Sequence, residues 1–292
     1  MPDDVTDPSR PSNRSGVRGH GRLELTFRQD AEGRSYLAEQ FATYPFHVCR
    51  TQHLDHQLPD MATLYLQSCS GGVFAGDRLS AEFRAVEGAK AHVTTQASTI
   101  VHRTDDSSAA QSTVLVAERN SLLEYLPDPA ILFPGAHYRS KVVATCHPES
   151  DLIVCDSFLN HDPDGRGGRF AGFESELTIR DQDSAVMAID RFSVSGDQFA
   201  GGELSDGEPY SVHGTLTVVS ARVDLLALRQ TLRAEIDALA GIYAGVSLLP
   251  NDRGLWLRYL AADGVAARTL VMAAWSAARV ALTGFSPTLR RK

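Results

Sequence analysis

The run Gly71–Arg78 is the first stretch whose spacing could do chemistry, because Gly71 and Gly76 are separated like the glycines of a phosphate-binding loop. Such a loop continues with Lys and then Ser or Thr, which neutralise phosphate and hold magnesium. Asp77 occupies the position of that lysine, and a carboxylate there would repel phosphate. The run therefore predicts a glycine turn between strands rather than a nucleotide site.

Imidazoles and thiols are the next groups that could carry a reaction. His92, His102 and His137 lie near the ends of predicted strands, and one of them would have to meet a carboxylate in a closed pocket to form a hydrolase centre. No G-x-S-x-G or H-E-x-x-H motif occurs, so no catalytic residue is assigned. No C-x-x-C pair occurs either, which argues against a structural zinc site among the cysteines, which are Cys49, Cys69, Cys146 and Cys155.

The elements that must position these groups are mostly short, β-branched or alternating segments, which are typical of strands. Turn signals such as Glu87-Gly88, Pro134-Gly135 and Asp206-Gly207 separate them. The predicted strands are 23–27, 63–67, 91–96, 113–117, 122–126, 141–145, 152–158, 174–180, 185–195, 212–223 and 254–260.

Helical periodicity is confined to the last quarter of the chain. Leucine and isoleucine recur every three or four residues in Asp224–Ala240, with Asp224 as the N-cap and Gly241 after the end. Val265–Thr283 is a second, alanine-rich helix that Gly284 ends. The sequence therefore predicts a mainly β scaffold of stacked, layered or β-helical strands with two C-terminal helices.

The composition excludes several classes of protein. The 292 residues carry a formal net charge of -8, which disfavours a nucleic-acid binder. Residues 1–22 are rich in Pro, Arg and Asp and predict a disordered tail, so a single domain is expected over residues 23–292. The longest apolar runs are too short to span a membrane, and a cytoplasmic location with reduced thiols is expected.

Three segments, in order, resemble the signature of the UreD (UreH) family of urease accessory proteins. Ser70–Leu79 resembles its glycine–aspartate loop, Ala91–Thr99 its Thr-Thr-Gln strand, and Leu123–Phe133 its L-E-[WY]-L-P segment. The positions that carry this signature are Gly71, Gly72, Gly76, Asp77, Thr94, Thr95, Gln96, Glu124 and Pro127. Each of them could instead have a purely structural role.

The resemblance implies a non-enzymatic scaffold of stacked strands with two helices. Members of the family assemble with the accessory protein UreF and the GTPase UreG on apo-urease, and the complex guides nickel into the urease active site. Nickel would pass transiently, with no tightly bound cofactor, and GTP chemistry would belong to UreG. A β-scaffold hydrolase and a nickel-storage protein are the alternatives.

A transfer path should hold nickel weakly through a few oxygen or imidazole ligands. Asp77, Glu124 and Asp156 are the candidates, because they are carboxylates at otherwise apolar or turn-rich positions. Each has a structural alternative, since buried carboxylates usually have hydrogen-bond partners. Asp77 would cap the glycine turn, Glu124 would form a cross-strand pair, and Asp156 would bond backbone amides.

Overall fold

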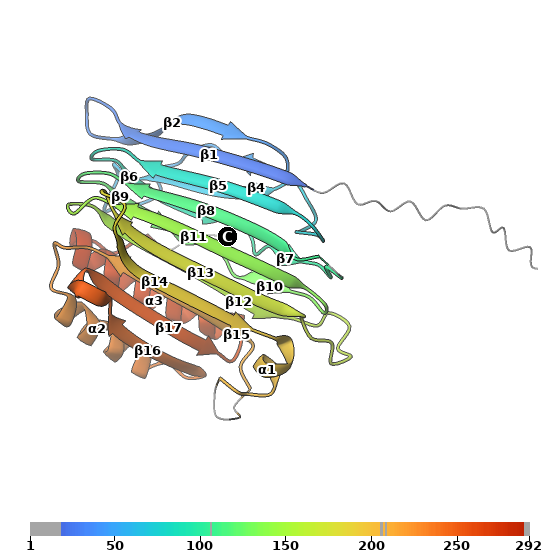
Figure 1. Ribbon diagram of the computed structural model, residues 1–292. Helices are drawn as coiled ribbons and strands as arrows, with labels where there is room; N and C mark the ends of the chain where they lie inside the picture. The colour runs from blue at the N-terminus through green and yellow to red at the C-terminus, as the bar shows by residue number, and fades with distance from the viewer. Residues whose placement is uncertain (1–18, 106, 205–206, 208, 289–292) are drawn as a thin grey trace, which may run out of the picture.

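A computed structural model gives the fold of the chain and describes residues 19–105, 107–204, 207 and 209–288 (Figure 1). Residues 1–18, most of the predicted tail, lie outside the described residues. The first strand already begins at His20, so residues 20–22 of that predicted tail are strand instead.

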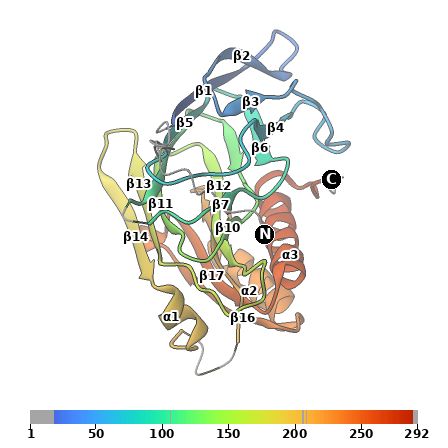
Figure 2. The same cartoon turned by 90° about the vertical axis from the view of Figure 1, so that its right-hand side faces the viewer.

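The strands form two sheets that face each other, as Figure 2 shows from their edges. The seven-stranded sheet, hereafter sheet A, has the order β14 (Val186–Val194), β13 (Gly172–Asp181), β11 (His137–Cys146), β8 (Ala109–Ala117), β5 (Arg78–Ala85), β1 (His20–Gln29) and β2 (Ser35–Ala42). Sheet B has the order β16 (Ile242–Leu248), β17 (Gly254–Ala261), β15 (Val212–Val219), β12 (Asp151–Asn160), β9 (Leu122–Tyr125), β6 (Lys90–Thr95), β4 (Ala62–Ser68) and β3 (Phe46–Val48).

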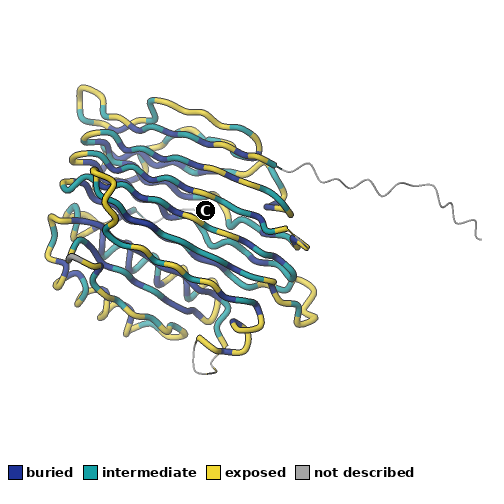
Figure 3. Tube along the Cα trace, in the orientation of Figure 1, coloured by how far each residue is buried: buried dark blue, intermediate teal, exposed yellow. Residues whose placement is uncertain are grey.

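The middle of the chain winds as a solenoid, because successive strands alternate between the two sheets. β4, β6, β9 and β12 pair in parallel in sheet B, while β5, β8, β11 and β13 pair in parallel in sheet A. Burial alternates along strands of sheet A such as β5 and β8, whereas β6, β9 and β12 of sheet B are buried along most of their length, as the colours of Figure 3 show. The predicted mainly β, stacked-strand scaffold is therefore confirmed.

Two coils of the solenoid have a break that the third lacks. β12 runs without interruption, and its second half pairs with β10 (Ala130–Leu132), which pairs in turn with β7 (Ile100–Val101). In the earlier coils, residues 96–99 separate β6 from β7, and residues 126–129 separate β9 from β10. These breaks open the scaffold beside the signature segments.

Two long helices cover part of the outer face of sheet B (Figure 2). In α2 (Leu225–Asp237), Asp224 is the N-cap, as predicted, but Ala238 is the C-cap, so the helix ends before the predicted Ala240. α3 (Gly264–Thr283) ends at Gly284, which adopts a left-handed conformation as predicted. Two short helices, α1 (Gly196–Ala200) and η1 (Pro250–Asp252), were not predicted from the sequence.

By length and composition, α3 is long and apolar enough to cross a membrane. Here it lies across β12, β15 and β17 and packs against α2. Leu270, Ala274, Trp275 and Ala278 are buried in the cluster between these helices and sheet B. Packing on the sheet therefore accounts for the apolar face of this helix.

Candidate functional site

The glycine loop between β4 and β5 is a turn held by Asp77. The Asp77 carboxylate accepts hydrogen bonds from the backbone N–H of Phe74 at 2.9 Å and of Gly19 at 3.0 Å. Gly72 and Gly76 have positive φ, and a Cβ on Gly72 would lie 2.5 Å from the carbonyl oxygen of Ile100. The structural alternative for Asp77, a cap on this turn, matches these contacts.

The Thr-Thr-Gln segment joins two coils where the strands break. Thr94 is buried and donates its hydroxyl to the carbonyl of Leu126 at 2.7 Å. Thr95, whose side chain lies on the opposite face, accepts a bond from the backbone N–H of Asp128 at 2.8 Å. The amide of Gln96 accepts a hydrogen bond from Gln67, and Pro127 lies in the break that follows β9.

Glu124 belongs to a buried network that joins sheet B to α3. Its carboxylate accepts two hydrogen bonds from Arg279, each 2.5 Å long, and one from the indole of Trp275 at 3.0 Å. The Nδ1 atom of His92 lies 2.7 Å from the same carboxylate. Arg279 also donates to Asp55, at 2.7 Å. Both Glu124 and Arg279 are almost completely buried.

The network explains the charge state of Glu124. Burial acts to raise the pKa of this carboxyl, but the charge of Arg279 and the hydrogen bonds from Arg279 and His92 outweigh it and lower the pKa to about 2. The Glu124 carboxylate is therefore ionised, and its oxygens are already bound by the positively charged guanidinium of Arg279. The expected cross-strand pair is present with His92, which lies directly opposite on β6, and Arg279 and Trp275 of α3 bind the same carboxylate.

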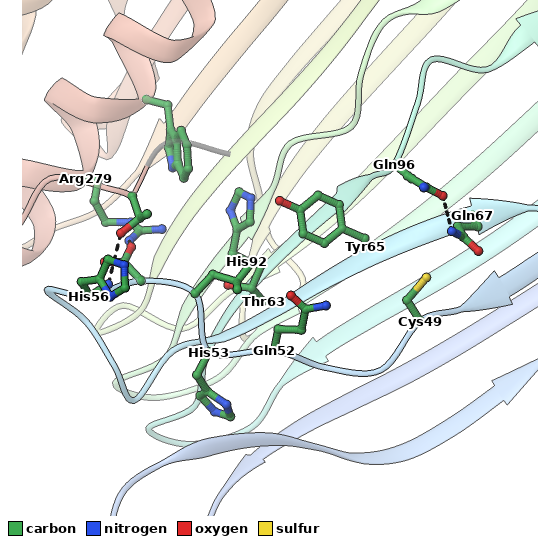
Figure 4. A pocket seen from close by; sticks show the side chains of 14 residues that line it. Cys49, Gln52, His53, His56, Thr63, Tyr65, Gln67, His92, Gln96 and Arg279 are labelled. Atoms are coloured by element: carbon green, nitrogen blue, oxygen red, sulfur yellow. Dashed lines mark hydrogen bonds and ion pairs between the residues drawn. The ribbon is translucent and has the colours of Figure 1, made fainter. Parts of the chain in front are cut away.

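A cleft of about 720 Å³ lies beside this network, on the part of sheet B that α3 leaves uncovered (Figure 4). Tyr65 and Gln67 come from β4, His92 comes from β6, and Arg279 closes the side formed by α3. Gln96 meets Gln67 at the far end of the cleft, as the dashed line in Figure 4 marks.

The three histidines of the hydrolase alternative are in three separate contacts. His92 meets Glu124 in the buried network. His102 stacks on Phe74 and lies 3.1 Å from the carbonyl oxygen of Gly71. His137 pairs with Glu174 on the outer face of sheet A, at 2.9 Å. The His–carboxylate pair that a hydrolase needs is thus present at His92, but its carboxylate is already bound to Arg279.

Polar residues occupy inward positions in the middle of the space between the sheets. On β12, Asp156 stands between Val154 and Phe158, which belong to two different hydrophobic clusters. We call the polar residues near the middle of this space the interior polar row. In sheet A it consists of Gln111, Ser140 and Ser175, which are paired in register, and of Asp190, which stands opposite Leu177. In sheet B it consists of Asp156, Thr215 and Arg258, which are paired in register.

Asp156 is one of the two carboxylates of the interior polar row, and it lies further inside than Asp190. Burial raises the pKa of Asp156 above its usual value, hydrogen bonds from Ser140, Ser175 and the backbone of Ser157 oppose the rise, and the charge of Asp190 adds to it. The residue is half-buried although it points between the sheets, so the interior is not close-packed there. The groups that oppose the effect of burial on Asp156 are the hydroxyls of Ser140 and Ser175 and one backbone amide, whereas only backbone amides were expected from the sequence.

A cavity of about 440 Å³ leads from the glycine loop toward this row. Gly72 and Thr99 line its outer part, and Gln111 and Tyr125 line its inner part. The Gln111 amide bridges Tyr125 and Tyr138, with hydrogen bonds of 3.4 Å to each. Burial and then the nearby charge of Asp156 raise the pKa of Tyr138, so Tyr138 lies near Asp156 in the interior.

At the opposite edge of the sandwich, Arg258 of β17 donates to Asp190 of β14 at 2.6 Å. Sequence reasoning missed this pair, together with Gln111, Ser140 and Ser175. A signal was available, because Ser140 and Ser175 interrupt the apolar side of strands whose neighbouring inward residues are Val142 and Leu177.

The candidates for nickel therefore occupy three separate places: Asp77 at the surface turn, Glu124 under α3, and Asp156 inside the sandwich. Within residues 19–105, 107–204, 207 and 209–288, no three His, Cys, Asp or Glu side chains are grouped so that they could hold a metal ion. The four cysteines are free thiols, two of them buried.

Comparison with known proteins agrees with the resemblance seen in the sequence. The family described as UreD urease accessory protein matches residues 19–292. The protein named urease accessory protein UreD 1 from Pseudomonas syringae pv. syringae (strain B728a) is 38% identical over 268 residues, which cover 92% of this chain and 94% of that protein. UreD 1 of Methylorubrum extorquens (strain PA1) is 40% identical over 256 residues, covering 88% and 86% of the two chains. With this match over nearly its whole length, the chain belongs to the UreD family of urease accessory proteins.

Proposed function

We propose that this chain is a non-enzymatic scaffold that acts with UreF and UreG to direct nickel into the active site of apo-urease. The observation that carries the proposal is the interior polar row. Asp156, two serines and a glutamine lie between hydrophobic clusters, and a cavity that begins at the glycine loop reaches the glutamine, Gln111. A polar group inside a β-sandwich costs stability, so its presence needs a reason other than packing.

The chemistry of the row suits passage of a dication better than storage. A lone carboxylate flanked by hydroxyls offers few, weak oxygen ligands to nickel, whereas tight storage calls for several converging ligands. Asp156 therefore remains our candidate for transit. Asp77 and Glu124 are weaker candidates, because a backbone turn and Arg279 already occupy their oxygens.

The hydrolase alternative has less support. The carboxylate of the His92–Glu124 pair is held by Arg279 and Trp275, so it cannot serve chiefly to orient and charge His92. We also propose a cytoplasmic location, which the four free thiols support.

The test is co-expression with apo-urease and the other accessory proteins, followed by metal analysis and urease assay. We expect omission of this chain to abolish nickel loading, and Asp156→Asn to reduce it strongly. Asp237→Asn, which removes a charge from a side chain that is 64% exposed at the end of α2, is the matched control and should load nickel normally. Full loading by a folded Asp156→Asn chain would overturn the assigned path.

A nickel titration of the isolated chain separates transfer from storage. Transfer predicts weak binding, and storage predicts tight, stoichiometric binding. Saturation at one or more equivalents in the nanomolar range would favour the storage alternative.

A further inference from the structure

The outer end of the interior polar row is closed by one ion pair between the two sheets. Arg258 donates from Nη2 to Oδ1 of Asp190 at 2.6 Å. The side chain of Asp190 is 10% exposed and that of Arg258 is 42% exposed, so the carboxylate lies inside and the guanidinium reaches the solvent. Asp190 also lies near enough to Asp156 for its charge to raise the pKa of that residue.

Besides this ion pair, Arg258 is held by two aromatic rings, and its side chain is partly exposed. Its guanidinium lies over the ring of Trp256 at 4.6 Å and near that of Phe192 at 5.7 Å. Among the described residues, its Nε has no hydrogen-bond partner. Ring faces attract a cation without fixing its orientation, so the guanidinium can turn toward solvent while it stays on Trp256.

The neighbouring strand β15 contributes no second cation near Asp190. His213 faces the same space and stacks on Phe192 at 4.0 Å. Burial, and then the charge of Arg258, lowers the pKa of His213 to about 3, so this imidazole is neutral at pH 7. Arg258 is therefore the cation with which an incoming metal ion would compete.

We propose that Asp190 is the outermost carboxylate of the nickel path in this chain, and that Arg258 is the counter-ion that nickel displaces there. This inference rests on the proposed function, since it assumes that nickel reaches the row. Displacement suits transfer, because a dication attracts the carboxylate more strongly than a guanidinium does. Because Arg258 is partly exposed, breaking its ion pair and moving its guanidinium into solvent costs little free energy.

The test uses nickel titration of the isolated full chain, with and without the competing cation. We expect Arg258→Gln to bind nickel about fivefold more tightly than the wild type. A gain of this size corresponds to the free energy of a half-exposed ion pair, which nickel would no longer have to break. Arg258→Gln combined with Asp190→Asn should return to wild-type affinity or weaker. A residue with a purely structural role would give no such gain in affinity.

Arg222→Gln is the matched control, because Arg222 is 43% exposed and pairs with Asp151, which is 2% exposed and outside the row. Unchanged affinity in Arg258→Gln, or an equal gain in Arg222→Gln, would overturn the inference. Loss of urease loading in Asp156→Asn with no gain in Arg258→Gln would keep the path and reject Arg258 as the competitor. A gain in Arg258→Gln with normal loading by Asp156→Asn would keep the competition at Asp190 and reject the path.

Discussion

Two interior carboxylates of this chain are held in opposite ways. Glu124 is buried against Arg279, which lowers its pKa to about 2 despite the effect of burial. Asp156 is bonded by neutral serines, and burial raises its pKa. An ion pair compensates the first charge and nothing comparable compensates the second. Glu124 therefore has the features of a structural residue, and Asp156 those of a functional one.

Removal of the cation should be costly at Glu124. We expect Arg279→Met to lower the free energy of unfolding by about 3–5 kcal/mol, because Glu124 and Asp55 would be left as uncompensated buried charges. Urea unfolding measures this change. Arg28→Met, which breaks an exposed pair with Glu39, is the control and should cost about 1 kcal/mol or less. Similar losses in the two variants would contradict the structural role of the network.

Glu124 also predicts how stability depends on pH. Its folded pKa of about 2 lies below the ordinary value of 4.5, so its contribution is complete above pH 4.5 and is lost as the pH falls toward 2. The difference in free energy of unfolding between the wild type and Glu124→Gln should shrink over this interval. A difference that stays constant from pH 6 to pH 3 would show that the carboxylate charge is not what stabilises the fold.

Asp156 should behave in the reverse sense. Its folded pKa is raised, so ionisation is easier in the unfolded chain and destabilises the fold as the pH rises through the folded pKa. Asp156→Asn should therefore increase stability at pH 7, and the gain should disappear at low pH, where both side chains are neutral. Thermal unfolding at pH 7 and at low pH measures this, with Asp237→Asn as the exposed control. A loss of stability at pH 7 would mean that the serines need the charged form.

At the scale of the elements, the sequence was informative where the periodicity was local. Alternation predicted β1, β13 and β14, and 3-4 spacing with capping residues predicted α2 and α3. β3, β7 and β10 were missed because two or three residues carry no period. The longer strands β2, β5 and β16 were missed as well, although their length would carry one.

The site was less predictable, since its contacts join distant segments. Glu124 could be selected as a carboxylate in an apolar strand, but Arg279 lies 155 residues further along the chain. Likewise, Asp156 could be selected, whereas its contacts with Ser140, Ser175 and Asp190 depend on which strands face each other across the sandwich. Residue type was enough to select the candidate carboxylates. Only the fold showed that Glu124 is ion-paired and that Asp77 and Asp156 are not paired with any cation in the described part of the chain.

Gly214 shows how an element depends on one missing side chain. A Cβ at this position of β15 would lie 2.4 Å from the hydroxyl oxygen of Tyr259 and 2.7 Å from Cβ of Ser157. We expect Gly214→Ala to lower the free energy of unfolding by about 1–3 kcal/mol through overpacking. Gly245→Ala on β16 is the matched control, because its Cβ would meet nothing within 4 Å. Denaturant unfolding of the two variants checks this, and equal stabilities would contradict the close approach of Tyr259.

At the scale of the whole molecule, the solenoid places the signature segments and the interior polar row in one line. The break after β6, residues 96–99, lines the cavity beside the glycine loop, and this cavity reaches Gln111 and Tyr125. Asp156 follows within the interior, and the Asp190–Arg258 pair stands at the far edge. A parallel solenoid aligns equivalent positions of successive coils, so a polar residue repeated at one level becomes a continuous row.

This continuity makes Gln111 a point at which the proposed route can be blocked without removal of a charge. Leucine has nearly the size of glutamine but offers no ligand oxygen, and the hydrogen bonds it would remove are long, at 3.4 Å. Gln111→Leu should lower the free energy of unfolding by about 1–3 kcal/mol, because it removes a partner from the buried hydroxyls of Tyr125 and Tyr138. The chain should still fold, and nickel loading of co-expressed urease should fall several-fold. Gln230→Leu, on the exposed side of α2, makes the same substitution away from the row and should load nickel normally. Normal loading by a folded Gln111→Leu chain would mean that nickel does not pass between the cavity and Asp156, and the path would have to be sought on the outer surface of the sheets.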